Sequence, residues 1–130
     1  MNALSMLGLA DKVTFATLNV FGRNLNGISK VESRSGRDHY GNHSVMLMIG
    51  KNVKPGVIGG VAKGGSSGAY VASAIDSASG TAAMGGDIPA AETHVSAART
   101  LGAALGIPDD LLAADFTASA GGKIVRRALV

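Results

Sequence analysis

The chain has 130 residues, no cysteine and a net charge of +3, and 46% of its residues are hydrophobic. This length predicts a single domain over residues 1–130 that can bury a sizeable core. The lack of cysteine excludes disulfides, thiolate metal sites and a cysteine nucleophile. The basic residues are scattered and no apolar run approaches the ~20 residues of a membrane span, so the sequence predicts neither nucleic-acid binding nor a membrane segment.

The first part of the chain predicts a short helix followed by a strand. Residues 2–10 place Leu4 and Leu7 on one apolar side of a helix. Residues 12–21 (KVTFATLNVF) carry apolar and β-branched side chains on both faces, which is typical of a buried strand in a parallel sheet. A helix that leads into a buried strand predicts an α/β fold, with a mostly parallel sheet and flanking helices.

Long loops separate this strand from the next elements. Residues 22–42 form a polar loop, and loops of this length are uncommon unless they are functional or disordered. Residues 44–49 predict a second strand. Residues 50–86 are rich in glycine, serine and alanine, and they predict a flexible hairpin with surface loops. Residues 121–130 predict a short edge strand at the end of the chain.

The clearest helix is predicted after Asp87, which stands just ahead of Pro89 as a helix start would. Gly106 suits the C′ position, and Pro108 prevents the helix from continuing. One or two further helical turns are expected over residues 108–116. The helix has an apolar stripe, which consists of Val95, Ala98, Leu101 and Leu105.

The densest chemistry lies in the stretch SGRDHYGNHS, residues 35–44. Asp38 can supply a carboxylate oxygen and His39 a ring nitrogen, and His43 follows four residues later. Aspartate and histidine together suit Zn²⁺, Mn²⁺ or a similar divalent metal. The residues alone leave a second interpretation open, in which Asp38 caps a turn and the histidines are solvated loop side chains. His94, on the predicted helix, is interpreted as a surface or partly packed histidine.

Two stretches together resemble a known family. The first stretch is KVTFATLNVFGR, and the second, after a polar loop, is GRDHYGNHSVMLMIGKNVKPGVIGGV. Together they resemble the C-terminal part of uncharacterised bacterial sulfatase-like proteins. These proteins belong to the alkaline-phosphatase-like superfamily. Near the end of the chain, THVSAARTLGAALGIPDDLL resembles the family's last helix and the aspartate after it. The likeness runs from about Leu4 to the C-terminus, and its most specific parts are FGR and GRDHYGNH.

The resemblance implies a fold, a site and an activity. The fold would be a partial alkaline-phosphatase-like α/β domain with a mostly parallel sheet, flanking helices and long glycine-rich loops. Asp38, His39 and His43 would bind the divalent metal, and Arg23 would contact the anionic group of a sulfate or phosphate ester. Family members are usually exported to the bacterial periplasm by the twin-arginine route, although this chain shows no signal peptide at its start.

Two departures from the family pattern affect the expected activity. The family has an acidic metal ligand just before Phe-Gly-Arg, where this chain has Val20, and Asn19 beside it is a weak substitute. The chain also begins in what would be the middle of a family member, without counterparts of the nucleophile and the N-terminal ligands. We therefore expect the hydrolase to be incomplete or inactive as an isolated chain, and an N-terminal segment or a partner chain to complete it.

The sequence thus leaves three functions open. The first is the metal-dependent hydrolase, in whole or in part. The second is a non-catalytic interaction or structural module with a decayed metal site, for which Val20 is the main observation. The third is plain anion or polyanion binding by basic side chains, which are Arg23, Lys30, Arg34, Arg37, Arg126 and Arg127.

Overall fold

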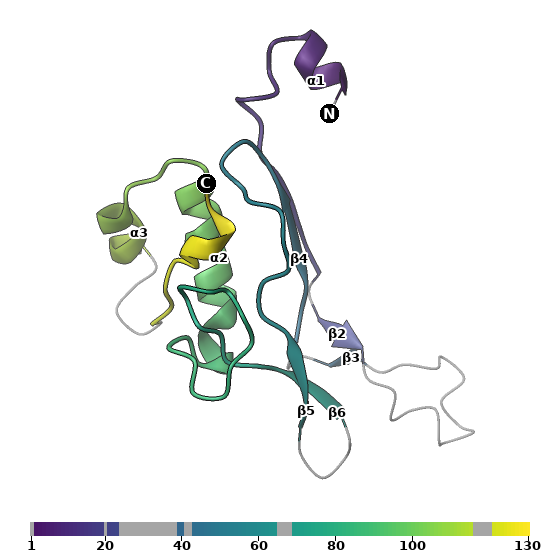
Figure 1. Cartoon of the computed structure of the whole chain (residues 1–130), viewed down its shortest axis with the longest axis vertical. Helices are drawn as coiled ribbons and strands as arrows, with labels where there is room; N and C mark the ends of the chain where they lie inside the picture. The colour runs from purple at the N-terminus through teal and green to yellow at the C-terminus, as the bar shows by residue number, and fades with distance from the viewer. Residues whose placement is uncertain (1, 20, 24–38, 41–42, 65–68, 116–120) are drawn as a thin grey trace, which may run out of the picture.

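A computed structural model describes residues 2–19, 21–23, 39–40, 43–64, 69–115 and 121–130 (Figure 1). Its strands form two-stranded antiparallel sheets. They pair β1 (Phe15–Leu18) with β4 (Met46–Ile49), β2 (Gly22–Arg23) with β3 (His39–Tyr40), and β5 (Val61–Gly64) with β6 (Ala69–Ala72). The helices are α1 (Asn2–Met6), α2 (Thr93–Ala104) and α3 (Asp109–Asp115), with 3₁₀ turns at Ala90–Glu92 and Arg126–Ala128.

The predicted α/β fold with a mostly parallel sheet is wrong, and so is the partial alkaline-phosphatase-like domain. β1 and β4 run antiparallel, with Phe15 opposite Ile49 and Leu18 opposite Met46. In the sequence, β2 and β3 lie between β1 and β4. Because β4 runs antiparallel to β1, the chain needs no helical crossover to bring β4 beside β1. The apolar residues on both faces of β1, which suggested burial, are exposed along the whole strand.

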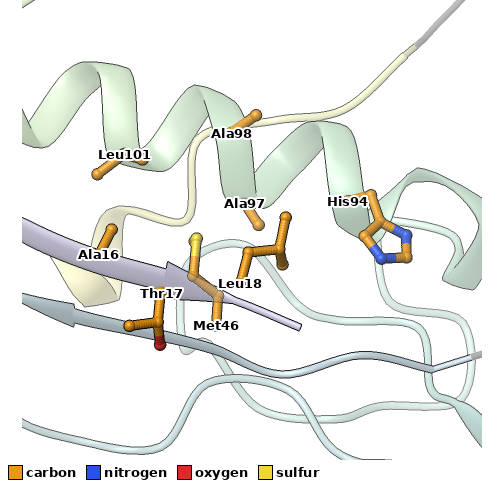
Figure 2. Close-up of a pocket in the computed structure, with 8 residues that line it drawn as sticks. All are labelled: Ala16, Thr17, Leu18, Met46, His94, Ala97, Ala98 and Leu101. Carbon is orange, nitrogen blue, oxygen red and sulfur yellow. The ribbon is translucent and has the colours of Figure 1, made fainter. Parts of the chain in front are cut away.

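The β1–β4 ribbon has two apolar faces with different surroundings. Leu18 and Met46 point toward α2, whereas Thr17 points away from it (Figure 2). Because side chains alternate along antiparallel strands, this defines two sets of residues. The inner face consists of Ala16, Leu18, Met46 and Met48, and the outer face consists of Phe15, Thr17, Leu47 and Ile49. Phe15 on the outer face is 55% exposed, so this face contacts water.

The best-packed part of the molecule lies beside α2. Ile88 is fully buried and packs with Ile75 and Val125, and Ile58 packs against this cluster. The backbones of Ile75 and Ile88 exchange two hydrogen bonds, with N···O distances of 2.9 and 3.0 Å. These bonds close the irregular loop over residues 75–88 around its own buried side chains.

α2 holds the C-terminal segment with polar side chains. Ser96 and Thr100 are buried, and they accept hydrogen bonds from the backbone N–H groups of Lys123 and Val125, both at 3.0 Å. Glu92, just before the helix, accepts one from Gly122 at 2.8 Å. The predicted apolar stripe is therefore not the buried face of α2. Its members Val95, Ala98 and Leu101 are half-buried, and Leu105 is 56% exposed.

Most of the predicted local elements are confirmed. The structure has α1, β4, α2 and α3 near the expected residues, and Gly106 takes a left-handed φ of +83° after α2. The predicted edge strand at 121–130 is instead a 3₁₀ turn with one bridge, between Leu129 and Val53. None of the helices in the described part of the chain is long and apolar enough to cross a membrane.

Asp87 does not start the helix as predicted. Its carboxylate accepts hydrogen bonds from the backbone N–H of Ser77 at 2.7 Å, from the Ser77 hydroxyl at 2.8 Å and from Lys123 Nζ at 2.8 Å. The hydrogen bond from Lys123, followed by those from Ser77, holds the pKa of Asp87 well below its ordinary value of 3.8. Asp87 therefore ties the 75–88 loop to the C-terminal segment.

We expect this contact to make stability sensitive to acid. Because the pKa of Asp87 is lower in the folded chain than in the unfolded chain, its stabilising contribution is complete above the unfolded pKa. That contribution is lost as the pH falls through the folded pKa. The urea midpoint of the natural chain should therefore fall more between pH 5 and pH 2 than the urea midpoint of the Asp87→Asn variant. The difference between the two falls should correspond to the titration of one carboxylate. Equal drops in the two proteins would contradict this role.

Candidate metal and anion site

The β2–β3 pair lies beyond one end of the β1–β4 ribbon (Figure 1). In this pair Gly22 is opposite Tyr40, and Arg23 is opposite His39. The backbones of two predicted site residues that are distant in the sequence are therefore cross-strand neighbours. Asp38 lies outside the described residues, and so do the side chains of Arg23 and His39.

His43 lies against β2. A Cβ added at Gly22 would overlap three atoms of the His43 ring, Nε2, Cδ2 and Cε1, so the ring packs directly on this glycine. Its Nδ1 lies 3.0 Å from the carbonyl oxygen of Tyr70. Because a carbonyl oxygen only accepts hydrogen bonds, Nδ1 carries the proton in this contact. In the neutral form of the ring the lone pair lies on Nε2, which is also the ring atom nearest to Gly22.

His94 reaches the same region from α2. Its Nε2 lies 2.5 Å from Oγ of Ser44, the residue that follows His43. The segments that carry all three histidines of the chain therefore meet at this end of the ribbon. The sequence predicted His94 to be a surface or partly packed residue, and the side chain is exposed. The contact with Ser44 was not predicted. Only the scarcity of histidine could have drawn attention to it, since 50 residues separate it from Ser44.

Asn19, the weak substitute for the family's acidic ligand, has a structural role. Its Oδ1 accepts a hydrogen bond from the backbone N–H of Val45 at 2.5 Å, and its Nδ2 donates to the carbonyl of Phe21 at 2.9 Å. The side chain therefore extends the β1–β4 pairing by one step. Both groups of the amide are engaged by the backbone, which argues against Asn19 as a metal ligand. Val20 lies outside the described residues.

The described residues fit a metal site only in part. Within these ranges no three histidine, aspartate or glutamate side chains are grouped to hold an ion. The hydrogen bond to Tyr70 fixes the orientation of the His43 ring, but the ring would have to turn away from Gly22 for Nε2 to bind a metal. The other two predicted ligands are Asp38 and His39, whose side chains the structure does not describe.

An apolar groove opens beside the Ser44–His94 contact, between the inner face of the ribbon and α2 (Figure 2). Its volume is about 270 Å³. His94 lies near one end and Leu101 near the other. The lining residues are Ala16, Thr17, Leu18, Met46, His94, Ala97, Ala98 and Leu101.

No protein-family model matches the chain, and no curated protein or solved structure matches it either. The resemblance to sulfatase-like proteins therefore stays a prediction from sequence motifs, chiefly FGR and GRDHYGNH.

Proposed function

We propose that the chain carries part of a divalent-metal site for sulfate or phosphate esters, and that a further polypeptide segment completes it. The observation that supports this most is the β2–β3 pairing, which sets Arg23 opposite His39 next to His43. Guanidinium is well shaped for a sulfate or phosphate group, and imidazole is a common ligand of Zn²⁺. Asp38, adjacent to His39 in the sequence, would add an oxygen ligand.

Each residue has a defined role in this proposal. Asp38, His39 and His43 bind Zn²⁺ or Mn²⁺, and Arg23 binds the anionic group of the ester. A bound metal would polarise the ester and help to activate a nucleophile. The proposal assigns no nucleophile to this chain, so ester hydrolysis requires an N-terminal segment or a partner chain.

The exposed β1–β4 ribbon is consistent with a further polypeptide segment that packs on this chain. No third strand pairs with β1 or β4 within the described residues. Neither strand contains a charged residue or proline, which natural edge strands use to prevent further pairing. The outer face also exposes Phe15 and Leu47, each by at least half. Because open strand edges and an exposed apolar face favour further pairing and packing, we expect further polypeptide to cover this ribbon.

Metal titration tests the proposed ligands. We expect the purified chain to bind Zn²⁺ or Mn²⁺ with a defined stoichiometry in isothermal titration calorimetry. The double variant His39→Ala/His43→Ala should lose this binding, whereas Asp110→Ala, an exposed carboxylate on α3, should retain it as the control. Loss of one ligand contact commonly lowers metal affinity by roughly ten-fold or more. Micromolar or tighter binding that survives in the double variant would contradict the assignment of these ligands.

A non-catalytic interaction module is the second candidate function. The exposed outer face of the ribbon favours it, since an apolar surface of this kind suits a protein interface. The use of both Asn19 amide groups by the backbone also fits a site that has lost its ligands. Light scattering together with an ester hydrolysis assay tests this candidate. A well-folded monomer that hydrolyses a sulfate or phosphate ester would contradict it.

A further inference from the structure

We infer that the groove between the inner face of the ribbon and α2 binds the apolar chain of an alkyl ester whose anionic group lies at the Ser44–His94 end. The choice of a sulfate or phosphate group rests on the proposed function. The assignment of the apolar chain rests on the groove alone, so the two parts can fail separately.

Hydrogen bonds at both ends of α2 join the helix to the ribbon. At the start of the helix, His94 Nε2 lies 2.5 Å from Ser44 Oγ, just before β4. At its end, Asn52 Nδ2 donates to the carbonyl of Ala104 at 2.9 Å, just after β4. The ribbon is therefore fastened to the helix on either side of the groove.

The far side of α2 is fixed as well. Ser96 and Thr100 hold the C-terminal segment through the backbone of Lys123 and Val125. A movement of the helix alone toward the ribbon would break these buried contacts. A buried donor left without its partner is unfavourable, so these contacts favour the observed position of α2.

The lining residues select a narrow apolar ligand. Small side chains, Ala16 from β1 and Ala97 from α2, leave the space open, and Met46 is flexible enough to adapt to a ligand. A volume of about 270 Å³ lies just below the range typical of drug-sized ligands, so the groove suits a single short alkyl chain. Leu18 and Leu101 add apolar surface for such a chain.

The polar end determines where the head group lies. His94 is exposed, and because its ring and the Ser44 hydroxyl share one hydrogen bond, one donor of the pair remains for an anion. Ser44 directly follows His43, whose ring packs on Gly22, the neighbour of Arg23 in β2, and Arg23 forms the proposed oxyanion site. An alkyl sulfate or alkyl phosphate therefore fits with its chain in the groove and its anionic group at the site.

Methyl NMR of the natural chain tests the inference with octyl sulfate, octanol and inorganic sulfate as probes, below the micelle-forming concentration of octyl sulfate. We expect octyl sulfate to shift the Met46 methyl resonance saturably. The methyl groups of Met6 and Met84, which are 88% and fully exposed, should not shift. Comparable shifts at all three methionines would show unspecific detergent binding and would overturn the inference.

A pair of variants locates the chain in the groove. Ala97→Phe fills the groove and should weaken octyl sulfate binding at least ten-fold. Ala113→Phe, on the exposed side of α3, is the matched control and should leave binding unchanged. Unchanged affinity in a folded Ala97→Phe protein would overturn the inference, and the methyl shifts decide the matter if this variant does not fold.

The three probes separate the inference from the proposed function. Octyl sulfate that binds more tightly than octanol supports both. Equal binding of octanol and octyl sulfate supports the groove and contradicts the oxyanion site. Binding of inorganic sulfate with no gain from the octyl chain overturns the groove and leaves the oxyanion site in place.

Discussion

Replacing Ile88 with alanine is expected to lower the free energy of unfolding by about 2–5 kcal/mol. Ile88 is fully buried and packs with Ile75 and Val125, so the change removes apolar contacts and leaves a cavity. A loss of this size is a large part of the roughly 5–15 kcal/mol that stabilises a typical domain. Urea denaturation followed by far-UV circular dichroism measures it.

Ile107→Ala is the matched control for this prediction. Ile107 follows α2 and is 41% exposed, so its truncation should change the free energy of unfolding by only about 0.5 kcal/mol. Equal losses in the two variants would show that the cluster around Ile88 is not the stabilising core. A large loss in Ile88→Ala alone would place the stability of the chain in the part beside α2.

Elements with local signals could be predicted from the sequence. The start of α3 follows Pro108, and the end of α2 follows from Gly106, whose left-handed φ favours glycine. The strand β4 alternates between half-buried and exposed residues, as the pattern of residues 44–49 allows. These features depend on a few neighbouring residues, so they do not require knowledge of the tertiary fold.

Features that depend on tertiary contacts could not be predicted. Apolar residues on both faces of β1 suit a strand buried in a parallel sheet, but they equally suit a ribbon with one face toward a helix and the other toward a partner. In α2, Ser96 and Thr100 look like a polar surface until the C-terminal segment supplies N–H groups for them to accept. The burial of these hydroxyls depends on residues about 25 positions away.

In the candidate site, too, some features could be predicted from the sequence and others could not. The sequence predicted His43 as a ligand because it lies in a dense cluster of possible ligands, and this role stays a prediction. The β2–β3 pairing could not be foreseen, because strands of two residues are too short to show a period. The contact between Ser44 and His94 likewise joins segments that no sequence spacing connects.

Gly22→Ala is expected to disrupt the candidate metal site. The added Cβ would overlap the ring of His43, so the ring must move and give up its hydrogen bond to Tyr70. Loss of that hydrogen bond removes the contact that fixes the protonation form of the ring, and such changes lower metal affinity by about 10–100-fold. Zn²⁺ titration of the variant measures this loss of affinity.

A double-mutant cycle with His43→Ala shows whether the effect of Gly22→Ala acts through the ring. In the His43→Ala background there is no ring to displace, so Gly22→Ala should change the free energy of unfolding little. In the natural background it should cost about 0.5–1.5 kcal/mol, the typical net value of one hydrogen bond. The two changes are then coupled. If Gly22→Ala has the same effect in both backgrounds, it acts through the β2–β3 backbone instead, and the packing of His43 on Gly22 does not position the ring for metal binding.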